Sequence, residues 1–400
     1  MTNEEYWFWL CNIRDIYQPD IKRLLEHFSS PEEIYLADEE KLRQCGCLND
    51  KDLHHIALSK KSGRFMEVLG KLKRENIEFI YPGHPEFPDC LDILPDKPFC
   101  LYVKGKLPDC RVPSAGMVGS RACSAYGRDY AGQIAAVLAG EGVQIISGMA
   151  IGIDSISAQS AINSGGKTFA VLGGGVDVIY PRENIELYYE IITSGGGIIS
   201  EYPLGTAPLG WQFPHRNRLI TAFSDVLVVI EAGKHSGTLT TAMHALNQGK
   251  DIYALPGRVS DRLSEGCNGL IADGAGMITS PSSVLDALKC TSKWQRFSRS
   301  ADTSGETNAL NAAPSVSATE NTRKRTARME QNIADSSSIN SVQNNVKQDV
   351  LRLASGKYLT IDEMVQTLGL SISDANQVIC EMELEGLISR LPSGQFIRKF

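Results

Sequence analysis

The sequence lacks long apolar runs. No stretch of its 400 residues approaches the roughly 18 consecutive apolar residues of a membrane span. At its start, Glu4 and Glu5 stand where a secretory signal would have basic residues. We therefore expect a cytoplasmic protein without a membrane segment.

Motifs for metal and catalytic sites are also missing. Ten cysteines are present, but the nearest two are Cys45 and Cys47, and no C-x-x-C occurs. This spacing disfavours zinc, and free thiols in this number are typical of a reducing cytosol. The chain has no H-E-x-x-H or G-x-S-x-G, and no G-x-G-x-x-G follows its first strand. We therefore expect no metal, no dinucleotide cofactor and no catalytic residues.

The chain divides into four regions by pattern. Residues 1–80 show helical spacing of apolar side chains and predict a small helical domain, with a faint helix-hairpin-helix signal. Residues 81–290 predict a Rossmann-like domain. Residues 291–345 are rich in Ser, Thr, Asn and Ala, which predicts a disordered linker. Residues 346–400 predict helices with a terminal hairpin, as in a winged helix.

Within 81–290, apolar runs end in glycine-rich turns, and each turn opens a helix. Strands of this kind, buried on both faces and alternating with helices, are typical of an α/β fold with a doubly wound, mostly parallel sheet. Ligands of such folds bind at the carboxyl ends of the strands, where these turns gather.

The first of these turns has the residues of an anion site. Gly119 lets a ligand approach the backbone, Ser120 adds a hydroxyl donor, and Arg121 adds a guanidinium fork. A tight turn with a solvated arginine explains the same residues. Repetition of the pattern at later strand ends favours phosphate binding. The further candidates are Ser147, Gly148, Gly174, Ser236, Gly237 and Thr238.

A basic stretch beside an aromatic residue is the strongest functional signal. Phe213 is followed by Arg216, Asn217 and Arg218. Single-strand binding uses cations that follow phosphates and rings that stack on bases. Alternatively, Phe213 is a core residue and the arginines pair with acids, as the net charge of −7 allows. Arg182 either extends this basic track or pairs with a nearby acid.

Taken in order and spacing, these motifs resemble the DNA-processing protein A family (DprA, also called Smf). The resemblance covers about half of the chain. Its segments are Gly119-Ser120-Arg121, Ser147-Gly148-Met149-Ala150 with Gly152-Ile153-Asp154, Leu172-Gly173-Gly174-Gly175 with Asp177 and Tyr180-Pro181, Phe213-Pro214 with Arg216-Asn217-Arg218, and Ser236-Gly237-Thr238-Leu239.

The resemblance implies a protein that binds single-stranded DNA without catalysis. Such proteins displace single-strand-binding protein, load the RecA recombinase during natural transformation and dimerise through the Rossmann-like domain. It also implies that Ser120 and Arg121 hold phosphate and that Phe213 and Arg216 lie in the DNA groove. Two departures are Ala158, where many members have His, and Gly210, where many have Lys.

Three further expectations concern the C-terminal domain and two alternative functions. The C-terminal domain carries an acidic helix, which predicts protein contacts rather than tight duplex binding. A nucleotide phosphoribohydrolase would need glutamates after Gly237-Thr238, where this chain has Leu239, Thr240 and Thr241. A nucleotide-sensing regulator would bind a mononucleotide saturably, whereas a strand-binding protein gains affinity with strand length.

Overall fold

The computed structural model describes residues 1–16, 18–234 and 236–302, together with short pieces of the C-terminal part. Those pieces are residues 350, 366–368, 378, 382, 388–390 and 396–398. The chain forms two compact units, residues 1–308 and residues 309–400.

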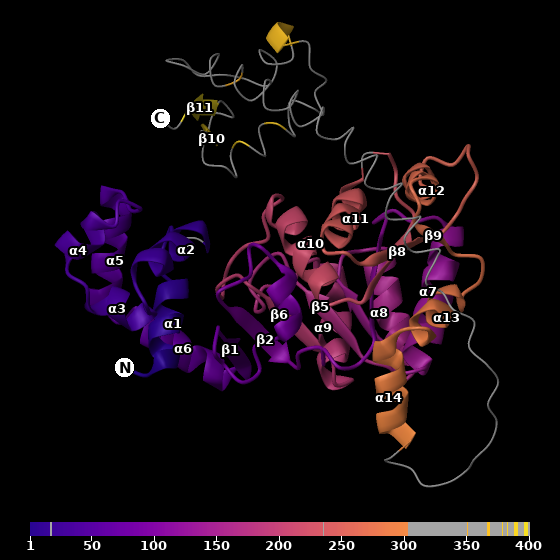
Figure 1. Cartoon of the computed structure of the whole chain (residues 1–400), viewed down its shortest axis with the longest axis horizontal. Coiled ribbons are helices and arrows are strands. Elements are labelled where there is room, and N and C mark those ends of the chain that lie inside the picture. Colours follow the sequence, from indigo (N-terminus) through magenta and orange to yellow (C-terminus); the bar gives the residue numbers. More distant parts are fainter. Residues whose placement is uncertain are drawn as a thin grey trace. The chain divides into compact units, whose positions relative to one another are not determined.

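Helices fill the first part of the larger unit (Figure 1). Thr2 caps the first helix with a reciprocal box, because its side chain accepts from the Glu5 amide while Glu5 accepts from the Thr2 amide. The helices predicted for this region are therefore present. They are α1 (Asn3–Cys11), α2 (Gln18–His27), α3 (Pro31–Leu36), α4 (Glu39–Gln44), α5 (Asp50–Ser62) and α6 (Arg64–Arg74).

These helices share one apolar core with the edge of the sheet that follows. The Phe8 ring lies 4.9 Å from that of Phe79 and 6.4 Å from that of Tyr102, both on strands. An ion pair of 3.1 Å joins Lys71 of α6 to Asp177, in a loop after a central strand. The helical part is thus packed onto the sheet by apolar and ionic contacts.

The central sheet has nine strands in the order β1-β2-β6-β5-β4-β3-β7-β8-β9. The pairs β1–β2 and β2–β6 are antiparallel, and every other neighbouring pair is parallel. This confirms the mostly parallel sheet predicted from the sequence. The strands are β1 (Ile77–Ile80), β2 (Leu101–Gly105), β3 (Ser114–Gly119), β4 (Gln144–Ser147), β5 (Thr168–Val171), β6 (Gly197–Ser200), β7 (Val226–Ile230), β8 (Asp251–Ala254) and β9 (Gly276–Met277).

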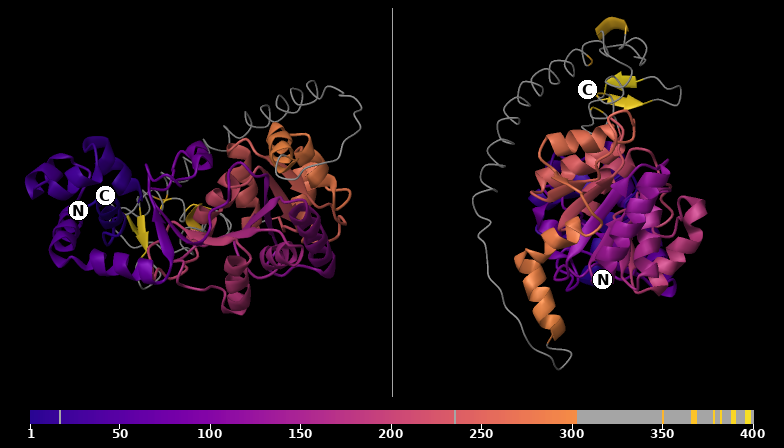
Figure 2. Two further views of the ribbon diagram at one scale, coloured as in Figure 1. Left: turned by 90° about the horizontal axis from the view of Figure 1, so that it is seen from below. Right: turned by 90° about the vertical axis from the view of Figure 1, so that its right-hand side faces the viewer.

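Helices cover both faces of the sheet (Figure 2). Ile145 of β4 and Val228 of β7 face α7, α8 and α13, whereas Ile146 and Val229 face α10, α11 and α12. This alternation explains why the strands read as continuous apolar runs. The helices are α7 (Ala125–Gly140), α8 (Ile153–Asn163), α9 (Ile185–Thr193), α10 (Gln212–Ala222), α11 (Gly237–Asn247), α12 (Glu265–Ala272), α13 (Ser283–Lys289) and α14 (Ser292–Asp302), with 3₁₀ turns η1 (Asp89–Ile93) and η2 (Arg182–Asn184).

The strand order reverses at β3, which pairs with β4 on one side and β7 on the other. In open α/β sheets this is the point where the loops diverge and a ligand crevice forms. Gly119, the last residue of β3, lies opposite Ile230 of β7. The switch point therefore lies where the sequence predicts its first phosphate loop.

Helix α14 occupies the start of the segment that we expected to lack structure. Trp294 packs against the core beneath α7 and α13, and Lys293 forms an ion pair of 2.7 Å with Asp225. Trp294 and Phe297 supply apolar surface for this helix. The average composition of residues 291–345 is so polar that it hides these two aromatic residues. Residues 303–345 lie outside the described part.

In the smaller unit, β10 (Ile388–Arg390) and β11 (Phe396–Arg398) form an antiparallel pair with Ile388 opposite Arg398. This is the hairpin expected from the terminal apolar run. Of the acidic helix predicted before it, only residues 378 and 382 are described, and its acidic residues lie outside the described part.

Replacing Gly119 with Ala tests the close approach of β3 and β7. A Cβ atom there would collide with the Ile230 carbonyl and lie 2.7 Å from Ile153 Cγ1. We expect G119A to lose about 2 kcal/mol of unfolding free energy, because a packed strand cannot move aside. Urea denaturation followed by circular dichroism measures this loss. G140A is the control, since a Cβ there meets nothing within 4 Å; equal stability of both variants would contradict the prediction.

Candidate functional site

Three loops meet at the carboxyl end of the sheet beside the switch point. The carbonyl of Ser120, after β3, accepts a hydrogen bond of 3.3 Å from the Ile153 amide at the start of α8. Gly152 makes this contact possible, since a Cβ there would lie 2.5 Å from the Ser120 carbonyl oxygen and 2.6 Å from that of Arg121. Gly152 also has a φ of +87°, which favours glycine. The first two sequence motifs are thus in contact.

Arg216 of α10 reaches under these loops. Its side chain donates to the carbonyls of Gly148, at 3.2 Å, and of Val171, at the ends of β4 and β5. Gly148 leaves room for this, because a Cβ there would lie 2.5 Å from Arg216 Nη2. Only 4% of Arg216 is exposed. The guanidinium therefore holds α10 against two strand ends.

Asp154, the second residue of α8, balances the charge of Arg216. Burial raises the pKa of the Asp154 carboxyl, and the charge of Arg216 opposes that rise. Burial lowers the pKa of Arg216 to about 10, and the charge of Asp154 works against this effect. Each buried group is therefore stabilised in its charged form by an opposite charge nearby.

Asp154 also occupies backbone donors of the second loop. It accepts hydrogen bonds from the amides of Gly148, at 3.1 Å, and Ala150, at 3.4 Å. These amides hold the turn rather than point at a ligand. Asp154 therefore stabilises this turn, and Gly148 contributes space.

Phe213 lies one helical turn before Arg216, and two cations lie near its ring. The guanidinium carbon of Arg121 is 5.4 Å from the ring centroid, and that of Arg216 is 5.9 Å away. Arg121 is exposed, while Phe213 is half-buried. Cation–π attraction keeps both charges at the ring.

Tyr180 completes this group; the sequence placed it in a family motif but did not indicate it as a binding residue. Its ring centroid lies 5.9 Å from that of Phe213, with 35° between the ring planes. Together with Ala150, Ile151 and Pro181, the aromatic and basic side chains line a small hollow. The available signal was the Tyr180-Pro181 pair immediately before Arg182.

Other predicted residues lie outside the lining of this hollow. Their partners are within the protein. The Ser147 hydroxyl donates to the Met117 carbonyl, and Gly174 packs against the Thr206 carbonyl. Asn217 accepts a hydrogen bond from Arg216 Nε. Ser236 caps α11 by accepting from the Thr238 amide, next to Gly237. Arg182 is exposed in η2.

Arg218 has the alternative role that the sequence left open. It is 2% exposed and pairs with Glu201 at 2.8 Å and with Asp96 at 2.6 Å. Glu201 also accepts a hydrogen bond of 2.7 Å from Gln18 of α2. Arg218 therefore locks α10 to the N-terminal helices.

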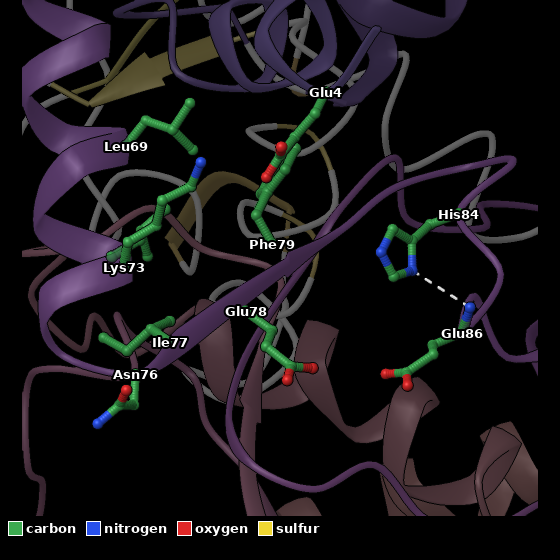
Figure 3. Close-up of a pocket in the computed structure, with 10 residues that line it drawn as sticks. Glu4, Leu69, Lys73, Asn76, Ile77, Glu78, Phe79, His84 and Glu86 are labelled. Atoms are coloured by element: carbon green, nitrogen blue, oxygen red, sulfur yellow. Dashed lines mark hydrogen bonds between the residues drawn. The ribbon is translucent and has the colours of Figure 1, made fainter. Parts of the chain in front are cut away.

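A second hollow lies beside the outer strand β1, between α1 and α6 (Figure 3). Glu4, Glu78 and Glu86 contribute three carboxylates to its lining, with Lys73 and His84. The Glu86 amide donates to His84 Nδ1 at 3.2 Å. Carboxylates in this number repel phosphate, so the hollow at the switch point is the better anion site.

A family model described as DNA recombination-mediator protein A matches residues 78–289, more than half of the chain. The chain belongs to this family. A second family model, described as the DprA winged helix domain, matches residues 340–394, in agreement with the winged-helix domain predicted for the C-terminal part.

Several characterised relatives align over much of this length. Protein Smf of Escherichia coli strain K12 is 34% identical over 294 residues, which are 74% of this chain and 77% of that protein. DNA processing protein DprA of Streptococcus pneumoniae is 37% identical over 58% of this chain and 85% of that protein. The X-ray structure of DprA from S. pneumoniae superposes with a TM-score of 0.58 and 32% identity, covering 72% of this chain and 98% of that chain.

The two positions at which this chain departs from many family members differ in setting. Ala158, on α8, is 2% exposed and packs in the apolar core. Gly210 is exposed just before α10, and a Cβ there would meet nothing within 4 Å. Only Gly210 therefore leaves open space where a cationic side chain would stand.

The described residues contain neither a candidate metal site nor a candidate membrane span. No group of three or more His, Cys, Asp or Glu residues is placed to hold a metal ion there. Likewise, no helix in the described part is long and apolar enough to cross a membrane.

The Glu201–Arg218 pair predicts a specific pH dependence of stability. Burial alone would raise the pKa of Glu201, but Arg218 and His215 hold it at about 2, below the ordinary 4.5. Because the folded state lowers this pKa, the ionised carboxylate stabilises the protein at pH values above 4.5. This stabilisation is lost as the pH falls towards 2. We expect E201Q to lose about 3 kcal/mol at neutral pH, because it removes the buried carboxylate from Arg218 and leaves the more exposed Asp96 as its ion-pair partner.

Urea denaturation at several pH values measures this effect. The difference between E201Q and the parent should shrink as pH falls through the interval from 4.5 to about 2. E40Q is the control, since Glu40 is exposed on α4. A difference that stays constant with pH would show that Glu201 acts through packing alone.

Proposed function

We propose that this protein binds single-stranded DNA across the hollow at the switch point, and that it acts by binding rather than catalysis. The observation that carries the proposal is the pair of guanidinium groups, Arg121 and Arg216, whose central carbons lie 5.4 and 5.9 Å from the centroid of the Phe213 ring. Cations beside a stacking ring suit a strand of phosphates and bases. Family membership supports the same function.

Each residue has a proposed role in this binding. Arg121, with Ser120, contacts a backbone phosphate, because it is exposed at the rim. Phe213 and Tyr180 offer ring surface to bases. Arg216 lies deeper and adds positive potential to the floor while holding α10 in place. Arg182, exposed in η2, extends the basic track.

The absence of carboxylates directly after Gly237-Thr238 supports binding over catalysis. Gly237 and Thr238 are followed by Leu239, Thr240 and Thr241, and Thr241 is buried. A hydroxyl cannot stabilise an oxocarbenium ion as a carboxylate does. Release of free base from nucleoside monophosphates would contradict this part of the proposal.

The proposal extends to the biological setting. We propose that the protein acts in the cytoplasm as a homodimer, displaces single-strand-binding protein and loads RecA during DNA uptake and recombination. The resemblance of its motifs to the family supports these partners, and one of the named relatives is a DNA processing protein. A RecA loader must act where recombination occurs, which accounts for the cytoplasmic assignment.

Replacing Arg121 with Ala tests the phosphate contact. We expect R121A to bind oligothymidine about tenfold more weakly, since one charged hydrogen bond is worth roughly 1.5 kcal/mol. The slope of log affinity against log salt should fall by about 0.7 for the lost phosphate contact. Fluorescence anisotropy measures both quantities.

The control is R43A, because Arg43 is exposed on α4 and pairs with Glu39 and Asp50, away from the hollow. Binding should grow with oligothymidine length and weaken equally for all sequences in R121A. Saturable binding of a mononucleotide with no gain for longer strands would instead favour a nucleotide sensor.

RecA loading gives a further prediction. On DNA coated with single-strand-binding protein, the parent protein should shorten the lag before RecA hydrolyses ATP, and R121A should restore most of that lag. The reason is that loading requires a grip on the strand. Full loading by R121A despite weak DNA binding would place the loading function outside the hollow.

A further inference from the structure

Two thiols meet at the side of the sheet, apart from the hollow. Cys90 belongs to η1, and Cys110 lies in the turn between β2 and β3. Their sulfur atoms are 2.8 Å apart and share a hydrogen bond. Both side chains are half-buried, and neither has a role in the site described above.

The surroundings make the two thiols unequal. The hydrogen bond between Cys110 and Cys90 lowers the pKa of Cys110 to about 7, helped by the charge of Lys293 and opposed by burial and by Asp109. The same hydrogen bond and burial raise the pKa of Cys90, against the charges of Lys250 and Lys293. Cys110 is therefore the thiol that ionises near neutral pH.

The other neighbouring thiols have different settings. Cys45 and Cys47 also lie 2.8 Å apart, but burial is the largest of the causes that raise the pKa of Cys47 to about 12. Cys100, next to Cys11, is fully buried, and its pKa is raised well above the ordinary value. Among the described thiols, Cys110 combines a lowered pKa with a partner in reach.

We propose that Cys90 and Cys110 form a thiol-oxidation site that reacts with low-molecular-weight disulfides such as glutathione disulfide. The Cys110 thiolate attacks one sulfur of the reagent, forms a mixed disulfide and releases one glutathione thiolate. Cys90 then loses its proton and attacks the Cys110 sulfur, which releases the second glutathione. Two protein thiols are oxidised to one disulfide, and one glutathione disulfide is reduced to two glutathione molecules.

The geometry favours the second step. A disulfide bond is about 2.05 Å long, so the sulfur atoms need to approach by less than about 1 Å. The linkage would close a loop that contains β2 and Asp96, the partner of Arg218. The proposal does not depend on DNA binding, so each can fail without the other.

Peptide mapping of the full chain tests the proposal. The reduced protein is incubated with glutathione disulfide at neutral pH, quenched with acid and digested with trypsin. We expect a disulfide between the peptide that carries Cys90 and the peptide that carries Cys110. Modification of Cys110 should be at least about tenfold faster than that of Cys47, because far more of Cys110 is thiolate.

Serine variants assign the two roles. C90S should accumulate a stable mixed disulfide at Cys110, and C110S should leave Cys90 unmodified. C45S is the matched control and should still form the Cys90–Cys110 bond. Thermal denaturation checks that each variant is folded, and the mapping of the parent chain needs no variant. Absence of the Cys90–Cys110 peptide in the parent, or earlier oxidation at Cys45 and Cys47, would overturn the proposal.

Discussion

The buried guanidinium of Arg216 is the contact on which the candidate site depends. It lies 3.2 Å from the Gly148 carbonyl oxygen, also donates to Val171, and so joins α10 to the ends of two parallel strands. A charge in so dry a place is costly unless an opposite charge is near, and Asp154 supplies it. Because Phe213 lies one turn earlier on α10, this anchoring fixes its ring beside Arg121.

Two arginines two positions apart on α10 have different roles. Residues at this spacing do not share a helix face. Arg216 faces the strand ends. Arg218 instead contacts Glu201, which follows β6, Asp96, which precedes β2, and Gln18 of the N-terminal helix α2. The basic run therefore serves two purposes, a positive floor for the hollow and a clamp between the helical region and the sheet.

Several glycines act by leaving space for other groups. Gly148 makes room for Arg216, and Gly152 lets the loop before α8 touch the backbone after β3. The hydroxyl of Ser236 and the amide of Gly148 are occupied within the protein. The positive potential of the hollow therefore comes from side chains of arginine more than from backbone amides, unlike a phosphate loop at a helix N-terminus.

The sequence alone determined the α/β class, the mostly parallel sheet and the loops at its carboxyl end, because buried strands and glycine turns leave local patterns. It also indicated Arg121 and Phe213 and left open whether Arg218 pairs with an acid. Tertiary structure alone decided which groups meet. Tyr180 contacts Phe213, Arg218 pairs with Glu201, and Cys90 contacts Cys110, although the members of each pair are far apart in the sequence. Local patterns cannot reveal these contacts, since each depends on where distant segments pack against one sheet.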